Sequence, residues 1–190
     1  MDPHLLTDGR LVDIRPIRSD DGERLQAAHS RLSAESRYRR FLGPKPTLTA
    51  ADARYLVDVD GADHFALVAT VPLGDPDGDI VAVTRFIRAT DDPQVAEFAI
   101  VVGDDYQRAG LATEMLDRLA RAALERGVCR FRAVMLADNL AVRRMLERLA
   151  AGELHEVRRG PLSEIEIRLW LVPTPVPSWA PAMIAGCAGS

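Results

Sequence analysis

The 190-residue chain contains few cysteines, few aromatic residues and no long apolar run. Cys129 and Cys187 are too few for the disulfide framework of a small secreted domain or for a set of thiolate metal ligands, and we expect no metal site. No apolar stretch approaches the about 20 residues that span a bilayer, and residues 1–10 lack the apolar core of a secretory signal. We therefore expect a cytoplasmic protein with no membrane association.

Lysine is almost absent, and the chain carries no excess of positive charge. Lys45 is the single lysine among 24 basic residues, the net charge is −4 and the pI is about 5.6. This balance excludes the basic surface that nucleic acids or anionic membranes require, so no nucleic-acid partner is expected. A coding bias toward arginine explains the missing lysines most simply, and a lysine-modifying enzyme that escapes its own activity is the alternative.

Hydrophobic residues make up 47% of the sequence, and the length suits one α/β domain. We expect that domain over residues 1–172, followed by a proline-rich tail over residues 173–190 that is disordered or forms an arm. Hydrophobic periodicity predicts strands at 11–17, 64–71, 80–88, 94–102, 129–136, 154–158 and 164–172, and helices within 19–32, 33–42, 49–56, 110–126 and 138–150. Short links favour antiparallel pairing, with parallel pairing only across the helix at 110–126, which predicts a mixed sheet flanked by helices.

The most informative segment is a strand followed by a loop and a helix that begins among small residues. Ala109, Gly110 and Ala112 stand where this helix starts. A helix N-terminus presents unpaired N–H groups and the positive end of the helix dipole, and small side chains let a phosphate approach the backbone. The lysine and hydroxyl residue of a Walker A loop are missing, as is the G-x-G-x-x-G fingerprint. An ordinary loop, with Gly110 required only by its backbone conformation, is the alternative.

The pattern Gln107-x-x-Gly110-x-Ala112 resembles the acetyl-CoA signature of the GNAT superfamily of N-acetyltransferases, Q/R-x-x-G-x-G/A. Asp138 and Asn139, between a strand and an amphipathic helix, match a second element of that family. The resemblance covers residues 11–172. It implies a mostly antiparallel GNAT-like sheet in which strand residues 100–102 and 131–136 form a splayed parallel pair beside acetyl-CoA, the cosubstrate.

The resemblance also assigns candidate contacts to acetyl-CoA. They are Ile100, Val101, Val102, Gln107, Arg108, Ala109, Gly110, Leu111, Ala112, Thr113, Asn139 and Arg143. The strand residues would offer backbone groups to the amides of pantetheine, and backbone donors at a bulge there would polarise the thioester carbonyl. For Asn139 the alternative is a helix N-cap, and for Arg143 it is a solvated helix face.

A finer resemblance concerns residues 32–41 (LSAESRYRRF) and Glu97-Phe98-Ala99, which look like the acetyltransferase domain of bacterial protein lysine acetyltransferases. That group implies Glu97 as the catalytic base. A surface or salt-bridged glutamate is the alternative. Free lysine and glutamate differ by about 6 pKa units, so Glu97 needs desolvation by the apolar strand face, a relay water, or a site that lowers the pKa of the amine.

The acceptor end of the site departs from the family pattern. Tyr38 and Phe41 are candidates for an acceptor groove, although the packed side of an amphipathic helix explains them equally. The helix after Asn139 has Met145-Leu146-Glu147 where many members have a tyrosine acid, so the thiolate leaves unprotonated or Tyr106 or Tyr38 serves. The family's glycine–aromatic pair is altered as well, because Gly152 is followed by Glu153.

The sequence therefore predicts an N-acetyltransferase that moves an acetyl group from acetyl-CoA to a primary amine, as a monomer or homodimer. The favoured acceptor is the ε-amine of a protein lysine. The first alternative is a small amine such as a polyamine, amino acid or aminoglycoside, and a cationic one would require carboxylates such as Asp58, Asp60, Asp104 and Asp105. The second alternative is a non-catalytic acyl-CoA sensor, which would bind the coenzyme without turnover.

Overall fold

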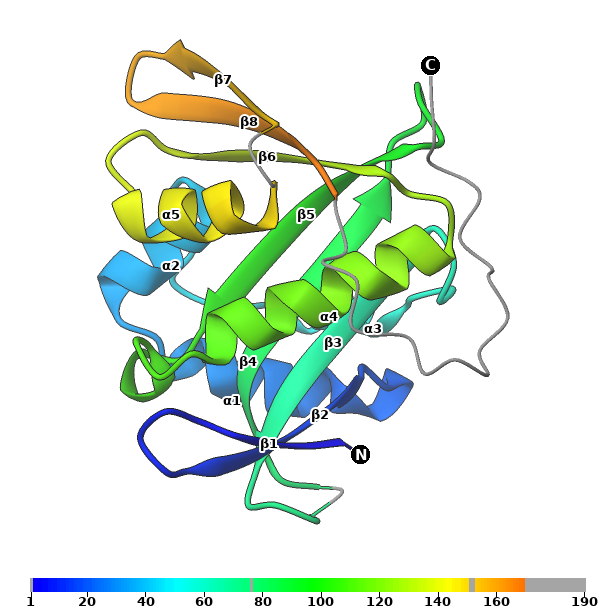
Figure 1. The fold of residues 1–190 in the computed structure, drawn as a ribbon. Coiled ribbons are helices and arrows are strands. Elements are labelled where there is room, and N and C mark those ends of the chain that lie inside the picture. The colour runs from blue at the N-terminus through cyan, green and yellow to red at the C-terminus, as the bar shows by residue number, and fades with distance from the viewer. Residues whose placement is uncertain (1, 76, 151–152, 170–190) are drawn as a thin grey trace.

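Eight strands form one mixed sheet in the order β1-β2-β3-β4-β5-β6-β8-β7 (Figure 1). The computed structural model describes residues 2–75, 77–150 and 153–169. The strands are β1 (Asp2–Leu5), β2 (Leu11–Pro16), β3 (His64–Val71), β4 (Asp79–Arg88), β5 (Val95–Val102), β6 (Arg130–Leu136), β7 (Leu154–Arg159) and β8 (Leu162–Arg168). The helices are α1 (Gly22–Ser30), α2 (Ala34–Phe41), α3 (Ala50–Val57), α4 (Leu111–Glu125) and α5 (Leu140–Leu149), with 3-10 turns η1 (Ser19–Asp21) and η2 (Asp104–Tyr106).

The predicted fold class is confirmed, including the seven predicted strands and five predicted helices. The sequence prediction missed β1, whose four residues, DPHL, have no apolar alternation; it is the edge strand of the sheet and pairs only with β2. The helix expected within residues 19–32 starts as the turn η1 before becoming α1. The proline-rich tail, Gly152 and the end of the last predicted strand lie outside the described residues.

The one parallel neighbour pair in the described sheet, β5 and β6, separates after a short ladder. The pairing runs from Val95↔Arg130 to Glu97↔Arg132, whereas β6 remains paired with β8 as far as Leu136↔Leu162. The predicted splay is therefore confirmed. The bulge expected in residues 94–102 is not there, because β5 stays in continuous register with β4 from Ala82↔Val102 to Arg88↔Ala96. The sheet opens because β6 departs together with β8.

Helices cover both faces of the sheet. The apolar side of α4 lies on one face, where Leu111, Met115 and Leu119 are fully buried in the larger core. α1 and α3 cover the other face and enclose a second cluster with residues such as Leu25 and Val68. α2 lies on this second side and contacts β5 and β6 where they diverge (Figure 1). One face is thus closed by a long helix and the other by shorter ones that border the gap.

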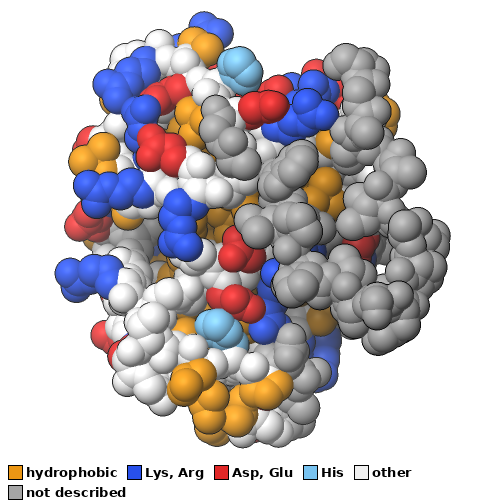
Figure 2. Space-filling model, in the orientation of Figure 1, with side chains coloured by type: hydrophobic (Ala, Val, Ile, Leu, Met, Phe, Trp, Pro, Cys, Tyr) orange, Lys and Arg blue, Asp and Glu red, His pale blue; other side chains and the backbone are white. Residues whose placement is uncertain are grey.

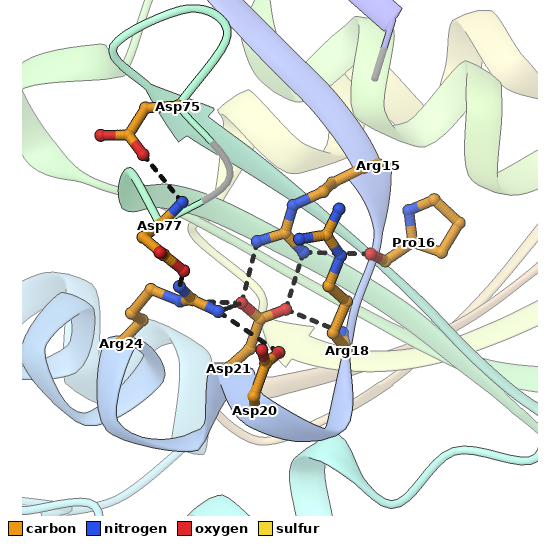
Figure 3. A network of polar contacts seen from close by, with 8 residues as sticks. All are labelled: Arg15, Pro16, Arg18, Asp20, Asp21, Arg24, Asp75 and Asp77. Carbon is orange, nitrogen blue, oxygen red and sulfur yellow. Dashed lines mark hydrogen bonds and ion pairs between the residues drawn. The ribbon is translucent and has the colours of Figure 1, made fainter.

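A buried ion pair fixes α1 against the sheet (Figure 3). Arg15 of β2 donates two hydrogen bonds of 2.7 and 2.9 Å to the carboxylate of Asp21, and both side chains are almost fully buried. Asp21 also accepts from the backbone N–H of Arg18 and from Arg24. Burial alone would raise the pKa of Asp21, but these hydrogen bonds and the charges of Arg15 and Arg24 lower it overall. The carboxylate therefore joins β2 to the start of α1.

Replacing Asp21 by asparagine should lower the free energy of unfolding by about 3–5 kcal/mol, because the buried guanidinium of Arg15 loses its countercharge. The exposed neighbour Asp20, which also pairs with Arg24, is the matched control, and Asp20→Asn should cost less than about 1 kcal/mol. Urea unfolding of the two variants measures both values.

The pH dependence provides a second test of this pair. A carboxylate whose pKa is lowered by folding stabilises fully above its unfolded pKa, about 3.9, and loses that contribution as the pH falls through the folded value. The difference in stability between the wild type and Asp21→Asn should therefore be constant near neutral pH and shrink below about pH 4. A difference that grows on acidification would contradict this account.

Candidate active site

A cleft of about 840 Å³ occupies the opening between β5 and β6. Its walls are residues of β5 and β6, the side of α2, the loop before α4 and the first turn of α5. Ile100, Val101, Val102, Gln107, Arg108, Ala112, Asn139, Glu97 and Phe41 are the predicted site residues that line it. The cleft therefore brings together the predicted base and most of the predicted coenzyme contacts.

The register of β5 decides which backbone groups face the cleft. The N–H of Gly103 donates to the Val81 carbonyl, and the N–H of Ala89 donates to the Val95 carbonyl. Because backbone groups alternate sides along a strand, odd-numbered residues of β5 face β4 and even-numbered ones face β6. Both backbone groups of Ile100 and the N–H of Val102 consequently point into the opening. The backbone groups of Val101 face β4, so Val101 lines the cleft with its side chain only.

The start of α4 has the backbone shape of an anion-binding turn. Arg108 and Gly110 adopt left-handed conformations with φ of 60° and 83°, and Gly110 caps α4 without a side-chain hydrogen bond. The N–H groups of the first helical turn have no intrahelical acceptors, so they are available to a phosphate. Ala109 and Leu111 are buried in the core, and they can contribute only their backbone. This geometry fits a pyrophosphate held by the backbone.

Hydrogen bonds from neighbouring elements hold this loop in place. Gln107 donates through Nε2 to the Val102 carbonyl (3.2 Å) and to Oγ of Ser36 (3.1 Å). Asp104 accepts from the backbone N–H of Ser33 and from Oγ of Ser36 at the start of α2. Burial would raise the pKa of Asp104, but these hydrogen bonds lower it. Gln107 thus serves to connect the loop, β5 and α2, and the two serines are site residues that sequence analysis did not identify.

Asn139 lies at the junction of α2 and α5. Its Oδ1 accepts from the backbone N–H of Val142 and from Arg39, and the side chain is 7% exposed. It is therefore an N-cap of α5 that also borders the cleft. Arg143 does not line the cleft and instead forms ion pairs with Glu147 and Glu156. Thr113 lies in the first turn of α4, away from the cleft lining.

Glu97, the predicted base, lines the cleft at the end where β5 and β6 are still paired. This side chain is exposed and forms no hydrogen bond or ion pair within the described residues, so the apolar strand face does not desolvate it. Phe41 borders this end of the cleft. Tyr38, whose side chain is 48% exposed, does not line the cleft. Tyr106 lies outside the cleft, stacked under the Arg10 guanidinium at 4.1 Å. Of the segment Met145-Leu146-Glu147, where the resemblance leads one to expect a tyrosine, Met145 lines the cleft.

Within residues 2–75, 77–150 and 153–169, no group of three or more His, Cys, Asp or Glu side chains is arranged to hold a metal ion. In the same ranges no helix is both long and apolar enough to cross a bilayer.

A sheet that opens between two parallel strands, beside a helix start with free N–H groups, is the arrangement that the resemblance to acyl-CoA-dependent acyltransferases implies. Comparison with known proteins agrees: residues 11–151 match the Acetyltransferase (GNAT) domain family. The chain belongs to this family and is a GNAT-type acetyltransferase. The GNAT family uses acetyl-CoA.

Three relatives make the similarity more specific. Acetyltransferase Pat of Mycolicibacterium smegmatis is 35% identical over 159 residues, covering 84% of this chain and 46% of that protein. Acetyltransferase PA5475 of Pseudomonas aeruginosa is 35% identical over 140 residues, or 73% of each chain. The crystal structure of the GNAT domain of S. lividans PAT superimposes with a TM-score of 0.76 at 31% identity, covering 88% and 96% of the two chains. The chain thus spans about half the length of the M. smegmatis protein, and the resemblance to bacterial Pat proteins is confirmed.

Replacing Gly110 by alanine should raise the KM for acetyl-CoA about tenfold, because the added Cβ strains a left-handed residue and displaces the N–H groups of the helix start. That Cβ would also lie 3.4 Å from Cγ2 of Thr7. Steady-state kinetics with varied acetyl-CoA measures the effect.

Gly127 provides the matched control, since it follows the other end of α4 with φ of 77° and has open space around it. Like Gly110→Ala, Gly127→Ala should lower the free energy of unfolding by about 1–2 kcal/mol. It should leave the KM for acetyl-CoA unchanged. Equal KM values for wild type and Gly110→Ala would show that the loop does not hold the coenzyme.

Proposed function

We propose that this chain acetylates the ε-amine of lysine residues in proteins, with Glu97 as the base that receives the amine proton. The observation that carries the proposal is the position of Glu97 in the cleft, on the strand whose free backbone groups adjoin the phosphate-binding loop. Residues 32–41, which resemble bacterial protein lysine acetyltransferases, form the helix α2 over the same cleft. The 35% identity to Pat of M. smegmatis supports the same acceptor class.

The cleft suits a sequential reaction in which both substrates are bound together. The acceptor nitrogen attacks the thioester carbonyl, the new N–C bond forms, the C–S bond breaks, and the coenzyme leaves as a thiolate. Glu97 takes the ammonium proton directly or through a water, which its exposure permits. The free N–H groups facing the opening, those of Ile100 and Val102, are the donors available to polarise the thioester carbonyl.

The leaving thiolate has no tyrosine to protonate it among the described residues that line the cleft. The thiolate of a thiol with a pKa of about 8.5 is already a fair leaving group at neutral pH. We therefore propose that the coenzyme departs as the thiolate and takes up a proton from solvent. Met145, which lines the cleft from this helix, is compatible with this route and supplies only an apolar wall.

Arginine, rather than aspartate, dominates the acceptor end, which argues against a polycationic acceptor. Arg39, Arg40, Arg85 and Arg132 line the cleft. Of the four aspartates considered for a cationic acceptor, Asp104 alone lines the cleft. Its carboxylate already accepts a hydrogen bond from the backbone N–H of Ser33 at the start of α2. Figure 2 shows Lys and Arg side chains gathered over α5 and α2 along the left edge of the molecule. Polyamines and aminoglycosides would be repelled here, whereas a protein surface with acidic groups would be attracted.

Replacing Glu97 by glutamine should lower kcat/KM for a lysine-containing protein or peptide about 10²–10⁴-fold, because the neutral amide cannot accept the proton. Acetyl-CoA binding should stay unchanged. Thiol release from acetyl-CoA reports turnover, and calorimetry reports binding. Glu35 also lines the cleft but pairs with Arg39, so Glu35→Gln serves as the matched control and should keep at least about a third of the activity.

The choice of acceptor in the same assay separates the alternatives. Turnover of lysine peptides, with none of spermidine or an aminoglycoside, is expected. Turnover of small amines alone would replace the proposed acceptor while retaining the family chemistry. Coenzyme binding without turnover of any protein or amine would favour the sensor, and equal activity of wild type and Glu97→Gln would remove Glu97 from the mechanism.

A further inference from the structure

A second, smaller cavity of about 160 Å³ adjoins the acceptor end of the cleft. It lies between α1, α2 and the sheet, and its walls are largely apolar, with Leu25, Leu48 and Leu56 among them. Arg40, Phe41 and Arg85 line both the cavity and the cleft. A space of this size accommodates a group of about six heavy atoms. The two arginines therefore stand at the opening between the acceptor end and an enclosed pocket.

Arg85 is a buried cation without a countercharge. It is 5% exposed, and its guanidinium donates to the Leu56 carbonyl (2.8 Å) and contacts Nε2 of His64 (3.0 Å), both of which are neutral partners. Burial and then the nearby charge of Arg40 lower the pKa of Arg85 to about 10. Buried charges are normally paired, as Arg15 is with Asp21 in this same chain. Arg85 departs from that rule.

Arg40 adds a second positive charge at the same place. Its guanidinium lies over the Phe41 ring at 4.9 Å and forms no hydrogen bond or ion pair within the described residues. Burial lowers the pKa of Arg40. Asp104 and Asp105 also line the cavity, but neither pairs with Arg40 or Arg85. Asp104 is held at the start of α2 by Ser33, roughly 10 Å along the helix from Arg40.

A third polar group in the cavity also lacks a partner. His29 is 6% exposed, it lines the cavity, and its Nε2 forms no hydrogen bond to any described residue. Burial and then the charges of Arg37 and Lys45 lower the pKa of His29, which keeps the ring neutral near pH 7. A hydrogen bond to the backbone of Lys45 raises the pKa of the ring, and because a neutral ring has one N–H, Nε2 is then an acceptor. The groups in this pocket that suit an anion are therefore Arg40 and Arg85, two guanidinium groups without a countercharge.

The pocket is close enough to Glu97 to bind a second part of the same acceptor. Arg85 pairs with Ala99 and Ile87 pairs with Glu97 across β4 and β5, so Arg85 and Glu97 lie on the same face of the sheet. Diagonal neighbours in such a ladder have Cα atoms about 7–8 Å apart. We infer that Arg40 and Arg85 form a carboxylate-binding subsite of the acceptor, so that the amine to be acetylated is presented together with a neighbouring carboxylate. The inference rests on the proposed function.

A carboxylate on the acceptor suits both the two guanidinium groups and the apolar walls. Guanidinium groups bind carboxylates through paired, charge-assisted hydrogen bonds, which are strongest when water is excluded. The apolar walls accept the methylene groups of an aspartate or glutamate side chain near the acceptor lysine. The α-carboxylate of a free amino acid is the other possible source of the same group. In either case the bound anion would neutralise the charge that the fold leaves unpaired.

The test compares two lysine peptides that differ only in having glutamate or glutamine beside the lysine. The wild type should show a kcat/KM at least about tenfold higher for the acidic peptide, through a lower KM, as expected for hydrogen bonds between charged groups. Arg40→Gln should reduce this preference to within about twofold. Arg37, on the same helix but lining neither cavity, is the control, and Arg37→Gln should keep the preference.

Binding of the same peptides to the acetyl-CoA complex, measured by calorimetry, tests the subsite independently of turnover. Equal affinity of the wild type for both peptides, or a preference unchanged in Arg40→Gln, would overturn the inference. If the acidic peptide binds in preference but no peptide is acetylated, the subsite stands and the proposed acceptor fails. Affinities for free lysine and lysine amide then identify which carboxylate binds. A preference of the wild type for free lysine that is lost in Arg40→Gln would assign the subsite to an α-carboxylate.

Discussion

The separation of β5 from β6 after Glu97 and Arg132 is the feature on which the active site depends. Strands in a closed sheet use their backbone groups on each other, and a ligand that binds through amides needs a strand whose groups are free. Here β5 keeps β4 on one side, and β6 keeps β8 on its far side. Opening the sheet therefore removes only a few ladder hydrogen bonds, and the free edge of β5 lines the cleft in which we propose that the coenzyme binds.

The remaining parts of the site are organised around that opening. α4 begins at the end of β5 with unpaired N–H groups, and Gln107 holds the connecting loop against Val102 and Ser36. α2 covers the opening from the other face and is tied to the loop through Asp104. At its far end α2 brings Arg40 and Phe41 to the acceptor side. A single short helix therefore connects the loop before α4 to the part of the cleft around Glu97, the proposed phosphate and acceptor ends, and movement of α2 would affect both.

Much of the fold and the coenzyme end was predictable from sequence because those features are local. The pattern Gln107-x-x-Gly110-x-Ala112 and its strand–loop–helix context need only neighbouring residues, and the structure gives them the expected backbone. The roles of Ile100 and Val101 were not separable in sequence, because the side that a backbone faces depends on the pairing of β5 with β4.

The acceptor end was less predictable because it is assembled from distant segments. Arg85 stands in a strand whose alternation gives no sign of a buried cation, and its partners come from α3 and β3. Arg143 was a candidate contact to the coenzyme because of its place on α5, but it forms ion pairs with Glu147 and Glu156 instead. Asp21 also gave no sequence sign of its burial, although it joins β2 to α1. Contacts that join separate elements, such as Arg143 with Glu156 and Arg15 with Asp21, depend on tertiary packing.

The account's central claim is that acetyl-CoA binds in the opening between β5 and β6 through backbone groups. Hydrogen–deuterium exchange of individual amides, with and without acetyl-CoA, tests this most directly. The account predicts that the coenzyme slows exchange at Ile100, Val102 and Leu111–Thr113 and has little effect at Val101, whose N–H is already paired with β4. Slowed exchange elsewhere in the chain, with these amides unchanged, would contradict it.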